Sequence, residues 1–463
     1  MRETRPPSRT RISRVLVANR GEIALRIVRA CADEGLSSVV VVSEADVDSL
    51  PAQLADEWVC IGPAAAAQSY LSVSAIIAAA VATGCDAIHP GYGFLSERVA
   101  LAEACERHGL RFVGPSVEAI RQGGDKVVAR TLAQSLGIPV SGGADAIDDA
   151  EEGARLADDL GYPVLIKAAA GGGGRGMVLV HSAEDLQTSF ARASSEAFQA
   201  FGDGRVYIER YLADARHVEV QVLGDDYGAV VHLGDRDCSC QRRYQKIVEE
   251  APASEVSPAI SARLASAATA LAAALAYSGA GTVEFLVDRA TEEFVFLEMN
   301  TRIQVEHPVT ELVTGVDIVR EQLRIAGGAP LSFAQEAVTV SGHAVECRIN
   351  AEDPAQDFRP MPGRIVEWVM PQGVDVRVDS HCFAGYTIPP FYDSLMGKLI
   401  AHGPDRATAI RRMESALERV RISGVTTNLA LLQEIVGNPD FRAGRLNTRW
   451  LETELLSRQT QEV

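Results

Sequence analysis

The residues from Glu298 to Glu306 place chemically active side chains at every second position. Five polar residues alternate here with mostly apolar ones, namely Glu298, Asn300, Arg302, Gln304 and Glu306. Alternate residues of an extended chain face opposite sides, so one side carries two carboxylates, two amides and a guanidinium. A buried strand rarely holds so many charged groups without partners, although a solvent-facing edge strand is the simpler alternative. The pattern therefore favours a site for a small anion.

A further carboxylate lies on the strand-like run just upstream. The runs 282–288 and 294–300 are joined by five residues, which predicts an antiparallel hairpin. Counting outward from the loop gives three opposed pairs: Asp288 with Phe294, Leu286 with Phe296, and Glu284 with Glu298. Other registers remain open to a loop of this length. Opposed Cβ atoms lie about 4.5–5.5 Å apart, so two ionised carboxylates there need a cation or a proton between them. Mg²⁺ accepts such oxygen ligands together with a substrate phosphate.

The polar segment cannot stay extended to its end. In a straight strand, steps of about 3.3 Å per residue would separate Glu298 from Glu306 by roughly 26 Å. That separation is too large for one small-ligand site. We therefore expect the chain to leave the sheet near Asn300 and to fold Arg302, Gln304 and Glu306 back over the metal.

A glycine-rich stretch lies earlier, at residues 167–177, between strand-like runs at 163–166 and 177–180. Glycine lets backbone N–H groups approach phosphate oxygens closely, and Lys167 and Arg175 add positive charge. The stretch fits neither the Walker pattern nor the dinucleotide fingerprint. A surface loop is the simpler alternative, but the carboxylates downstream favour a phosphate-binding lid that nucleotide should protect from hydrogen exchange.

Together these features resemble the ATP-grasp superfamily, and further motifs narrow the resemblance to biotin carboxylase. The motifs occur in the family's order, at residues 17–24, 89–97, 241–246, 298–307, 346–354 and 392–394. The match runs over nearly the whole chain. It implies an α/β protein, α+β overall, in three parts. These are a doubly wound N-terminal domain (12–124), an ATP-grasp domain (125–328) with a mobile lid at about 141–212, and a strand-rich C-terminal domain (340–451). Strand–helix alternation up to about residue 115 independently favours the doubly wound part.

The resemblance also implies an ATP site. Its residues are Lys126, Lys167, Gly173, Gly174, Glu209, Arg210, Tyr211, Leu212, His217, Gln241, Tyr244 and Leu286. The lysines would neutralise phosphate charge, the glycines would offer N–H groups, and residues 209–212 would form the adenine hinge. Some relatives carry His where this chain has Tyr244. Without the family, Lys126 is equally compatible with a helix surface and His217 with a satisfied core residue.

A bicarbonate site follows from the same resemblance. Its residues are Lys246, Arg302, Gln304 and Val305. The planar fork of Arg302 matches a carboxylate-like anion, and Glu306 would accept the bicarbonate proton. A purely structural Arg302–Glu306 ion pair is the alternative.

The metal and biotin sites complete the expected constellation. Glu284, Glu298 and Asn300 would hold Mg²⁺ or Mn²⁺ against the phosphates. Arg348 would stabilise the oxyanion of biotin, and Tyr92 would line the biotin approach. The expected catalytic residues are therefore Arg302, Glu306, Lys246 and Arg348.

The implied activity is ATP-dependent carboxylation of biotin through carboxyphosphate, the first half-reaction of an acetyl-CoA or other acyl-CoA carboxylase. A two-subunit pyruvate carboxylase, another ATP-grasp ligase and a non-catalytic ATP-binding protein are the alternatives. The four lysines are Lys126, Lys167, Lys246 and Lys398, and none follows a methionine as in a carrier hairpin. We therefore expect a separate biotin carrier protein and a separate carboxyltransferase subunit, with this chain as a homodimer.

Composition narrows the class of protein. At 463 residues, the chain is long enough for about three domains. Its net charge of −18 argues against nucleic acid and anionic membranes as partners. Its eight cysteines form no CxxC pair, which is typical of reduced cytoplasmic proteins. No apolar run approaches the roughly 20 residues of a membrane helix. We therefore expect a cytoplasmic enzyme.

Overall fold

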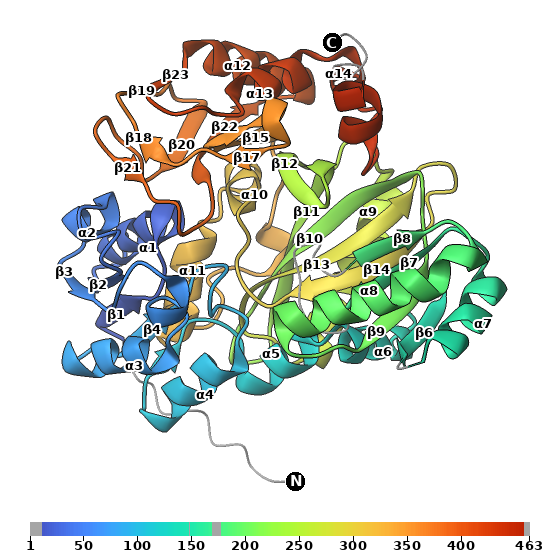
Figure 1. The fold of residues 1–463 in the computed structure, drawn as a ribbon. Helices are drawn as coiled ribbons and strands as arrows, with labels where there is room; N and C mark the ends of the chain where they lie inside the picture. The colour runs from blue at the N-terminus through green and yellow to red at the C-terminus, as the bar shows by residue number, and fades with distance from the viewer. Residues whose placement is uncertain (1–11, 148, 169–176, 458–463) are drawn as a thin grey trace.

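The structure is a computed structural model that describes residues 12–147, 149–168 and 177–457. Figure 1 shows the N-terminal part in blue on one side, the green and yellow middle part on the other, and the orange and red C-terminal part above. Gly173 and Gly174, predicted to contact phosphates, lie outside the described residues.

The N-terminal part is a parallel five-stranded sheet in the order β3-β2-β1-β4-β5. Its strands are β1 (Arg14–Val17), β2 (Ser37–Val42), β3 (Glu57–Cys60), β4 (Ala87–His89) and β5 (Arg111–Phe112). The central strands are runs of buried valine and leucine, as parallel sheets covered on both faces require. The helices of this part are α1 (Gly21–Asp33), α2 (Leu50–Leu54), α3 (Val73–Ala82), α4 (Val99–Arg107) and α5 (Val117–Gly124). This confirms the predicted doubly wound unit.

A small antiparallel sheet lies within the segment predicted as a lid. Its order is β6-β9-β7-β8, with β6 (Gly143–Ile147), β7 (Val164–Ala168), β8 (Met177–Val180) and β9 (Val206–Arg210). Two helices, α7 (Ala150–Leu160) and α8 (Ala183–Phe201), pack on it around a core of its own. This separate core gives the segment the means to move as a unit, which stays a prediction.

An eight-stranded antiparallel sheet runs through the middle and C-terminal parts. Its order is β14-β13-β10-β11-β12-β15-β22-β20. The strands are β10 (Ala215–Gly224), β11 (Val230–Arg242), β12 (Gln245–Ala251), β13 (Gly279–Asp288), β14 (Phe294–Asn300), β15 (His343–Asn350), β20 (Val376–Ser380) and β22 (Leu395–Gly403). Because β12 pairs with β15, one sheet joins strands from both segments that the sequence assigns to separate domains. The domain boundaries themselves stay a prediction.

The hairpin of β13 and β14 has a β-bulge that the sequence analysis did not foresee. Glu284 lies opposite Glu298 as predicted. Nearer the loop, however, Leu286 pairs with Val295 and Val287 with Phe294, so the predicted Leu286–Phe296 and Asp288–Phe294 pairs are wrong. The register shifts because Leu297 is an extra residue in β14 between the Glu284 and Phe285 pairs.

Helices cover the large sheet and complete the cores. α6 (Lys126–Ser135) and α9 (Pro258–Ala274) contribute to one core, together with β10, β13 and β14. The others are α10 (His307–Thr314), α11 (Ile318–Ala326), α12 (Arg406–Arg419), α13 (Leu429–Gly437) and α14 (Pro439–Arg442). Short ribbons close the C-terminal part: β16 (Glu352–Asp353) with β17 (Arg359–Pro360), β18 (Gly363–Arg364) with β21 (Thr387–Ile388), and β19 (Glu367–Val369) with β23 (Arg421–Ser423). Over the described residues, no helix is both long and apolar enough to cross a membrane.

Candidate active site

Side chains from the three larger sheets and their loops line one cavity of about 590 Å³. Every predicted site residue that the structure describes lies on its wall. These residues are Tyr92, Lys126, Lys167, Glu209, Arg210, Tyr211, Leu212, His217, Gln241, Tyr244, Lys246, Glu284, Leu286, Glu298, Asn300, Arg302, Gln304, Val305, Glu306 and Arg348. Residues spread over more than half of the chain therefore share one cavity.

The Lys246 ammonium lies at the centre of a ring of carboxylates. Its Nζ atom is 2.6 Å from Glu219 Oε2, 3.0 Å from Glu284 Oε1 and 2.6 Å from Glu306 Oε1. Burial disfavours the charge, but these three carboxylates outweigh it and raise the pKa of Lys246 well above its ordinary value. A permanent positive charge is thus fixed in the middle of the cavity.

A tight turn brings Lys246 into this position. Arg243 and Tyr244 have φ values of +45° and +65°, as the two central residues of a type I′ hairpin do. The turn pairs Gln241 on β11 directly with Lys246 on β12. Both side chains therefore reach the cavity from neighbouring strands.

The chain leaves the sheet at Asn300, as predicted, and folds back over the carboxylates. Glu284 Oε1 accepts hydrogen bonds from Asn300 Nδ2 at 2.8 Å and from Gln304 Nε2 at 2.7 Å. Arg302 Nη2 donates to Asn300 Oδ1 at 3.0 Å. Burial works against the charge of Glu284, yet Lys246 and His217 hold the pKa of its carboxyl well below the usual range. The Glu284 carboxylate is therefore ionised, and its oxygens are of the type that bind a divalent cation.

Arg302 pairs with a residue that the sequence analysis did not single out. Its Nε atom donates to Glu97 Oε2 at 3.0 Å, and the backbone N–H of Thr301 donates to Glu97 Oε1 at 3.1 Å. Glu97 thus orients the guanidinium from the N-terminal part. The alternative of a structural Arg302–Glu306 pair is not what forms among the described residues.

Glu306 lies between two cations. Lys246 contacts one of its oxygens, and Arg348 Nη2 donates to the other at 2.9 Å. Burial opposes the charge, but Lys246 and Arg348 outweigh it and depress the pKa of Glu306. Arg348 also donates to the buried carboxylate of Glu249. Glu306 is therefore an ionised carboxylate whose basicity depends on these two cations.

Two further lysines lie toward the small sheet. Lys126, the first residue of α6, pairs with Glu298 at 2.9 Å. Lys167 on β7 pairs with Glu209 on β9, which also accepts a hydrogen bond from Ser141 Oγ at 2.7 Å. Lys167 is buried and Lys126 is half-buried, and apolar residues such as Leu286 line the same cavity. This end of the cavity combines fixed cations with an apolar slot.

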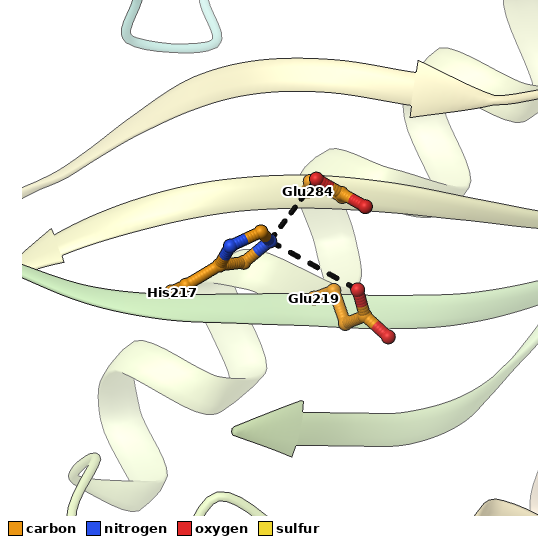
Figure 2. Close-up of side chains that lie close together, drawn as sticks. All are labelled: His217, Glu219 and Glu284. Carbon is orange, nitrogen blue, oxygen red and sulfur yellow. Dashed lines mark ion pairs between the residues drawn. The ribbon is translucent and has the colours of Figure 1, made fainter. Parts of the chain in front are cut away.

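His217, Glu219 and Glu284 have the donor types and spacing of a metal site. Figure 2 shows His217 and Glu219 on one strand, β10, and Glu284 on the adjacent strand, β13. His217 Nε2 lies 3.0 Å from Glu284 and 4.0 Å from Glu219, and all three residues are buried. Lys246 already contacts both carboxylates, so this cluster has its own cation and is better explained as an ion-pair network.

Comparison with known proteins identifies this arrangement. Two family models of biotin carboxylase match, the N-terminal domain at residues 11–120 and the C-terminal domain at 346–453. Between them, the ATP-binding domain of the carbamoyl-phosphate synthase L chain matches residues 125–334. The biotin carboxylase of Nostoc sp. is 52% identical to this chain, over 96% of this chain and 99% of that protein.

Solved structures agree with the family models. The biotin carboxylase of Campylobacter jejuni in complex with β,γ-ATP is 47% identical, with a TM-score of 0.93 over 96% of this chain and 99% of that one. The biotin carboxylase domain dimer of Hydrogenobacter thermophilus 2-oxoglutarate carboxylase, solved with MgADP, ADP and bicarbonate, is 45% identical. Its TM-score is 0.93 over 96% of this chain and 97% of that one.

This chain belongs to the biotin carboxylase family. It is an ATP-grasp ligase that carboxylates biotin at the expense of ATP.

Three partners in this biotin carboxylase fold were missed from the sequence: the buried Glu219 and Arg236, and the half-buried Glu97. Arg236 is 0% exposed and donates to Glu219, Gln221 and Gln304, so it fixes both β10 and the fold-back segment. A signal for Glu219 was available. His217, Glu219 and Gln221 alternate with valines on β10, in the same pattern that revealed the segment after Glu298.

Another network connects the N-terminal part of the biotin carboxylase fold to the C-terminal part. The hydroxyl of Tyr92 donates to Glu22, and Lys398 Nζ lies 2.9 Å from the same carboxylate. Lys398 also donates to the backbone carbonyl of Val305 at 2.7 Å. Tyr92 and Val305, both predicted site residues, are thus held by one ion pair.

Proposed function

We propose a division of the cavity into nucleotide, bicarbonate and biotin regions for the carboxylation of biotin. The observation that carries this proposal is the position of Glu306, held by Lys246 on one side and by Arg348 on the other. Lys246 lies beside the carboxylates that are opposite the small sheet. Arg348 lies on β15, among the C-terminal strands. A single proton acceptor therefore adjoins both halves of the reaction.

The nucleotide region is bounded by the small sheet and β13. Lys126 and Lys167 place positive charge where phosphates would lie, and residues 209–212 offer backbone groups to adenine beside Leu286. His217, Gln241 and Tyr244 close the region from β10 and the β11–β12 hairpin. Gly173 and Gly174, outside the described residues, would add N–H groups to the phosphates.

Residues opposite the lysines fit a divalent cation. Glu284 and Glu298 are directly opposed across β13 and β14, and Asn300 adds an amide oxygen. These are hard oxygen donors, as Mg²⁺ and Mn²⁺ require. Glu298 now pairs with Lys126, and that lysine can turn to a phosphate when one is present. A bound cation supplies charge neutralisation between the phosphates.

Bicarbonate binds beside Lys246 and Arg302. The guanidinium is held by Glu97 and Asn300, so its fork is oriented before substrate arrives. Gln304 and the backbone of Val305 complete the cradle. Bicarbonate competes with Glu306 for the charge of Lys246, which raises the pKa of Glu306 and makes it a better base. Glu306 then takes the proton as bicarbonate oxygen attacks the γ-phosphate, yielding ADP and carboxyphosphate.

Carboxyphosphate then breaks into CO₂ and phosphate, and closure of the proposed lid over the cavity would keep water from intercepting it. The released phosphate accepts the proton of the biotin ureido nitrogen, and that nitrogen attacks CO₂. Arg348 stabilises the negative charge on the ureido oxygen, and Tyr92 borders the path of biotin.

The biotin comes from a partner. All four lysines of this sequence have side chains at most 14% exposed and are ion-paired, so none is presented for biotinylation. We propose a separate carrier protein and a carboxyltransferase that passes the carboxyl group to an acyl-CoA. We further propose a homodimer in the cytoplasm, where the eight free cysteines stay reduced.

The activity assay is direct. Purified protein with MgATP and labelled bicarbonate should transfer label to free biotin, and ATP cleavage should require bicarbonate. Absence of label transfer at saturating biotin would contradict the activity. A streptavidin blot after expression with an active biotin ligase tests the carrier proposal. A strong band at the chain's own 49.5 kDa would contradict a separate carrier.

A further inference from the structure

Two carboxyl groups that take no part in the proposed reaction lie beside Arg348. Glu249 on β12 and Glu346 on β15 are opposed residues of the antiparallel ladder, so their Cβ atoms lie about 4.5–5.5 Å apart. Both residues are 0% exposed. Two ionised carboxylates do not coexist so close together away from water unless a cation or a proton lies between them.

The cations around this pair have other partners. Arg348 donates to Glu249 and Glu306, Lys398 to Glu22 and the Val305 carbonyl, and Lys246 to Glu219, Glu284 and Glu306. Lys398 on β22, Arg348 on β15, Lys246 on β12 and Glu306 before α10 are the charged groups that face the two carboxyls. Over the described part of the chain, no ion pair reaches Glu346. A proton is therefore what remains to relieve the repulsion.

Among the described residues, both carboxyl groups of the pair have oxygens that lack a hydrogen-bond partner. Within the described residues, Oε2 of Glu249 and both oxygens of Glu346 have no hydrogen-bond partner. One O–H group on Glu346, donated to Oε2 of Glu249, gives a partner to that oxygen and to one of the two Glu346 oxygens. Burial is also the main cause that raises the pKa of Glu249 to about 7. Burial raises the pKa of Glu346 well above its ordinary value, although Lys398 opposes this.

We propose that Glu346 is a neutral carboxylic acid whose proton is shared with Glu249, and that the Glu249 carboxylate so maintained positions Arg348 toward biotin. This inference rests on the proposed roles of Glu306 and Arg348. Arg348 is held by two carboxylates, and Glu306 loses its charge when it accepts the bicarbonate proton. Glu249 keeps its charge at that moment, because Glu346 supplies its hydrogen bond. The guanidinium therefore stays in place for the second half-reaction.

Matched substitutions separate the two roles. E249Q removes the carboxylate that orients Arg348, and it should lower kcat/KM for free biotin by about tenfold or more. E346A removes the proton donor and should cause a loss of the same kind. E346Q keeps an N–H donor without charge, and it should restore kcat/KM to within about threefold of the wild-type value. Bicarbonate-dependent ATP cleavage without biotin should change much less in all three variants.

Glu250 provides the control. It is the next residue of β12, it faces the other side of the strand, and it is buried between His343 and Arg406. E250Q should lower the melting temperature without changing kcat/KM for biotin. If E249Q and E250Q have the same kinetic effect, Glu249 is only a structural residue and the inference is wrong.

Infrared spectroscopy detects the proton without any activity. At neutral pH, the difference between wild type and E346Q should contain the C=O band of one protonated carboxyl, and no such band should vanish in E250Q. Equal spectra would overturn the inference even if wild-type carboxylation is normal. A wild-type protein that fails to carboxylate biotin contradicts the proposed function instead, and it leaves the infrared result to decide the state of Glu346.

Discussion

At the scale of single residues, the site works by sharing a few cations among many carboxylates. Lys246 contacts three glutamates and Arg348 contacts two. In the proposed mechanism, each substrate anion that enters this network displaces a protein carboxylate from a cation. We therefore expect substrate binding to change the basicity of Glu306 by exchanging one of its partners for another.

Arg348→Ala should separate the two half-reactions. The substitution removes the proposed oxyanion partner of biotin, so label transfer to free biotin should fall at least about a hundredfold. The affinity for ATP should stay within about threefold of the wild-type value, because the variant keeps Lys126 and Lys167 in the proposed nucleotide region. Isothermal titration with a nucleotide analogue and the label-transfer assay measure the two effects. Normal carboxylation in this variant would remove Arg348 from the mechanism.

Glu284→Gln and Glu298→Gln should both raise the Mg²⁺ concentration needed for ATP cleavage, by about tenfold or more. The effect should be larger for Glu284, because it also binds Lys246, Asn300 and Gln304, whereas the ion pair of Glu298 within the described residues is with Lys126. Titration of bicarbonate-dependent ATP cleavage with Mg²⁺ tests this order. Unchanged Mg²⁺ dependence in both variants would rule out a metal clamp at this hairpin.

At this scale, the sequence reveals functional side chains where they alternate along a strand. The alternation after Glu298 predicted the fold-back of Arg302, Gln304 and Glu306, and the structure confirms it. Glu97 could not be found this way, because it meets Arg302 only through the packing of the N-terminal part on the hairpin. Such a contact depends on tertiary structure and leaves no local pattern.

At the scale of elements, turns and helix ends place the reactive groups. The Arg243-Tyr244 turn sets Gln241 opposite Lys246, and Asp125 starts α6 so that Lys126 faces Glu298. The predicted hairpin of β13 and β14 was correct at Glu284 and wrong near its loop. Bulges arise from local backbone conformation at a residue such as Leu297, which carries no distinctive side chain.

Asp125→Ala should weaken ATP binding through the helix rather than through direct contact. Asp125 Oδ1 accepts hydrogen bonds from the N–H groups of Val127 and Val128, and loss of such a cap costs about 1 kcal/mol. The first turn then loosens and Lys126 is less well placed, so KM for ATP should rise several-fold while kcat changes less. Asp405→Ala is the matched control, because it caps α12 away from the cavity. A similar rise in KM for that variant would contradict the explanation.

At the scale of the whole molecule, one sheet continues from the hairpin with Glu284 to the strands that carry Arg348 and Lys398 (Figure 1). Composition indicated several domains, but it gave no sign that β12 and β15 would pair across them. The pairing places buried ionisable groups in the middle of a continuous sheet. The protonation of these groups is therefore linked to the stability of the fold.

The contributions of Glu249 and Glu250 to folding stability should therefore depend on pH in opposite directions. Burial raises the folded-state pKa of Glu249 from its ordinary value of 4.5 to about 7. The folded protein thus binds the extra proton between these values, and Glu249 contributes stability that is lost as the pH rises toward 7. For Glu250, burial is outweighed by His343 and Arg406, and the pKa falls to about 2. Its contribution is present above about 4.5 and is lost as the pH falls toward 2.

Thermal melts of wild type, E249Q and E250Q between pH 3 and 8 should therefore diverge in opposite directions. All three should melt at lower temperature in acid, since burial lowers the pKa values of His89 and His381 to about 3 and their charging opposes folding. Relative to wild type, E249Q should lose stability as the pH falls from 7 to 4.5, because it lacks the proton uptake of Glu249. E250Q should instead approach wild type as the pH falls from 4.5 to 3, because the contribution of Glu250 declines as the pH falls toward its folded-state pKa of about 2. Parallel curves for E249Q and wild type would mean that Glu249 has an ordinary pKa in the folded protein.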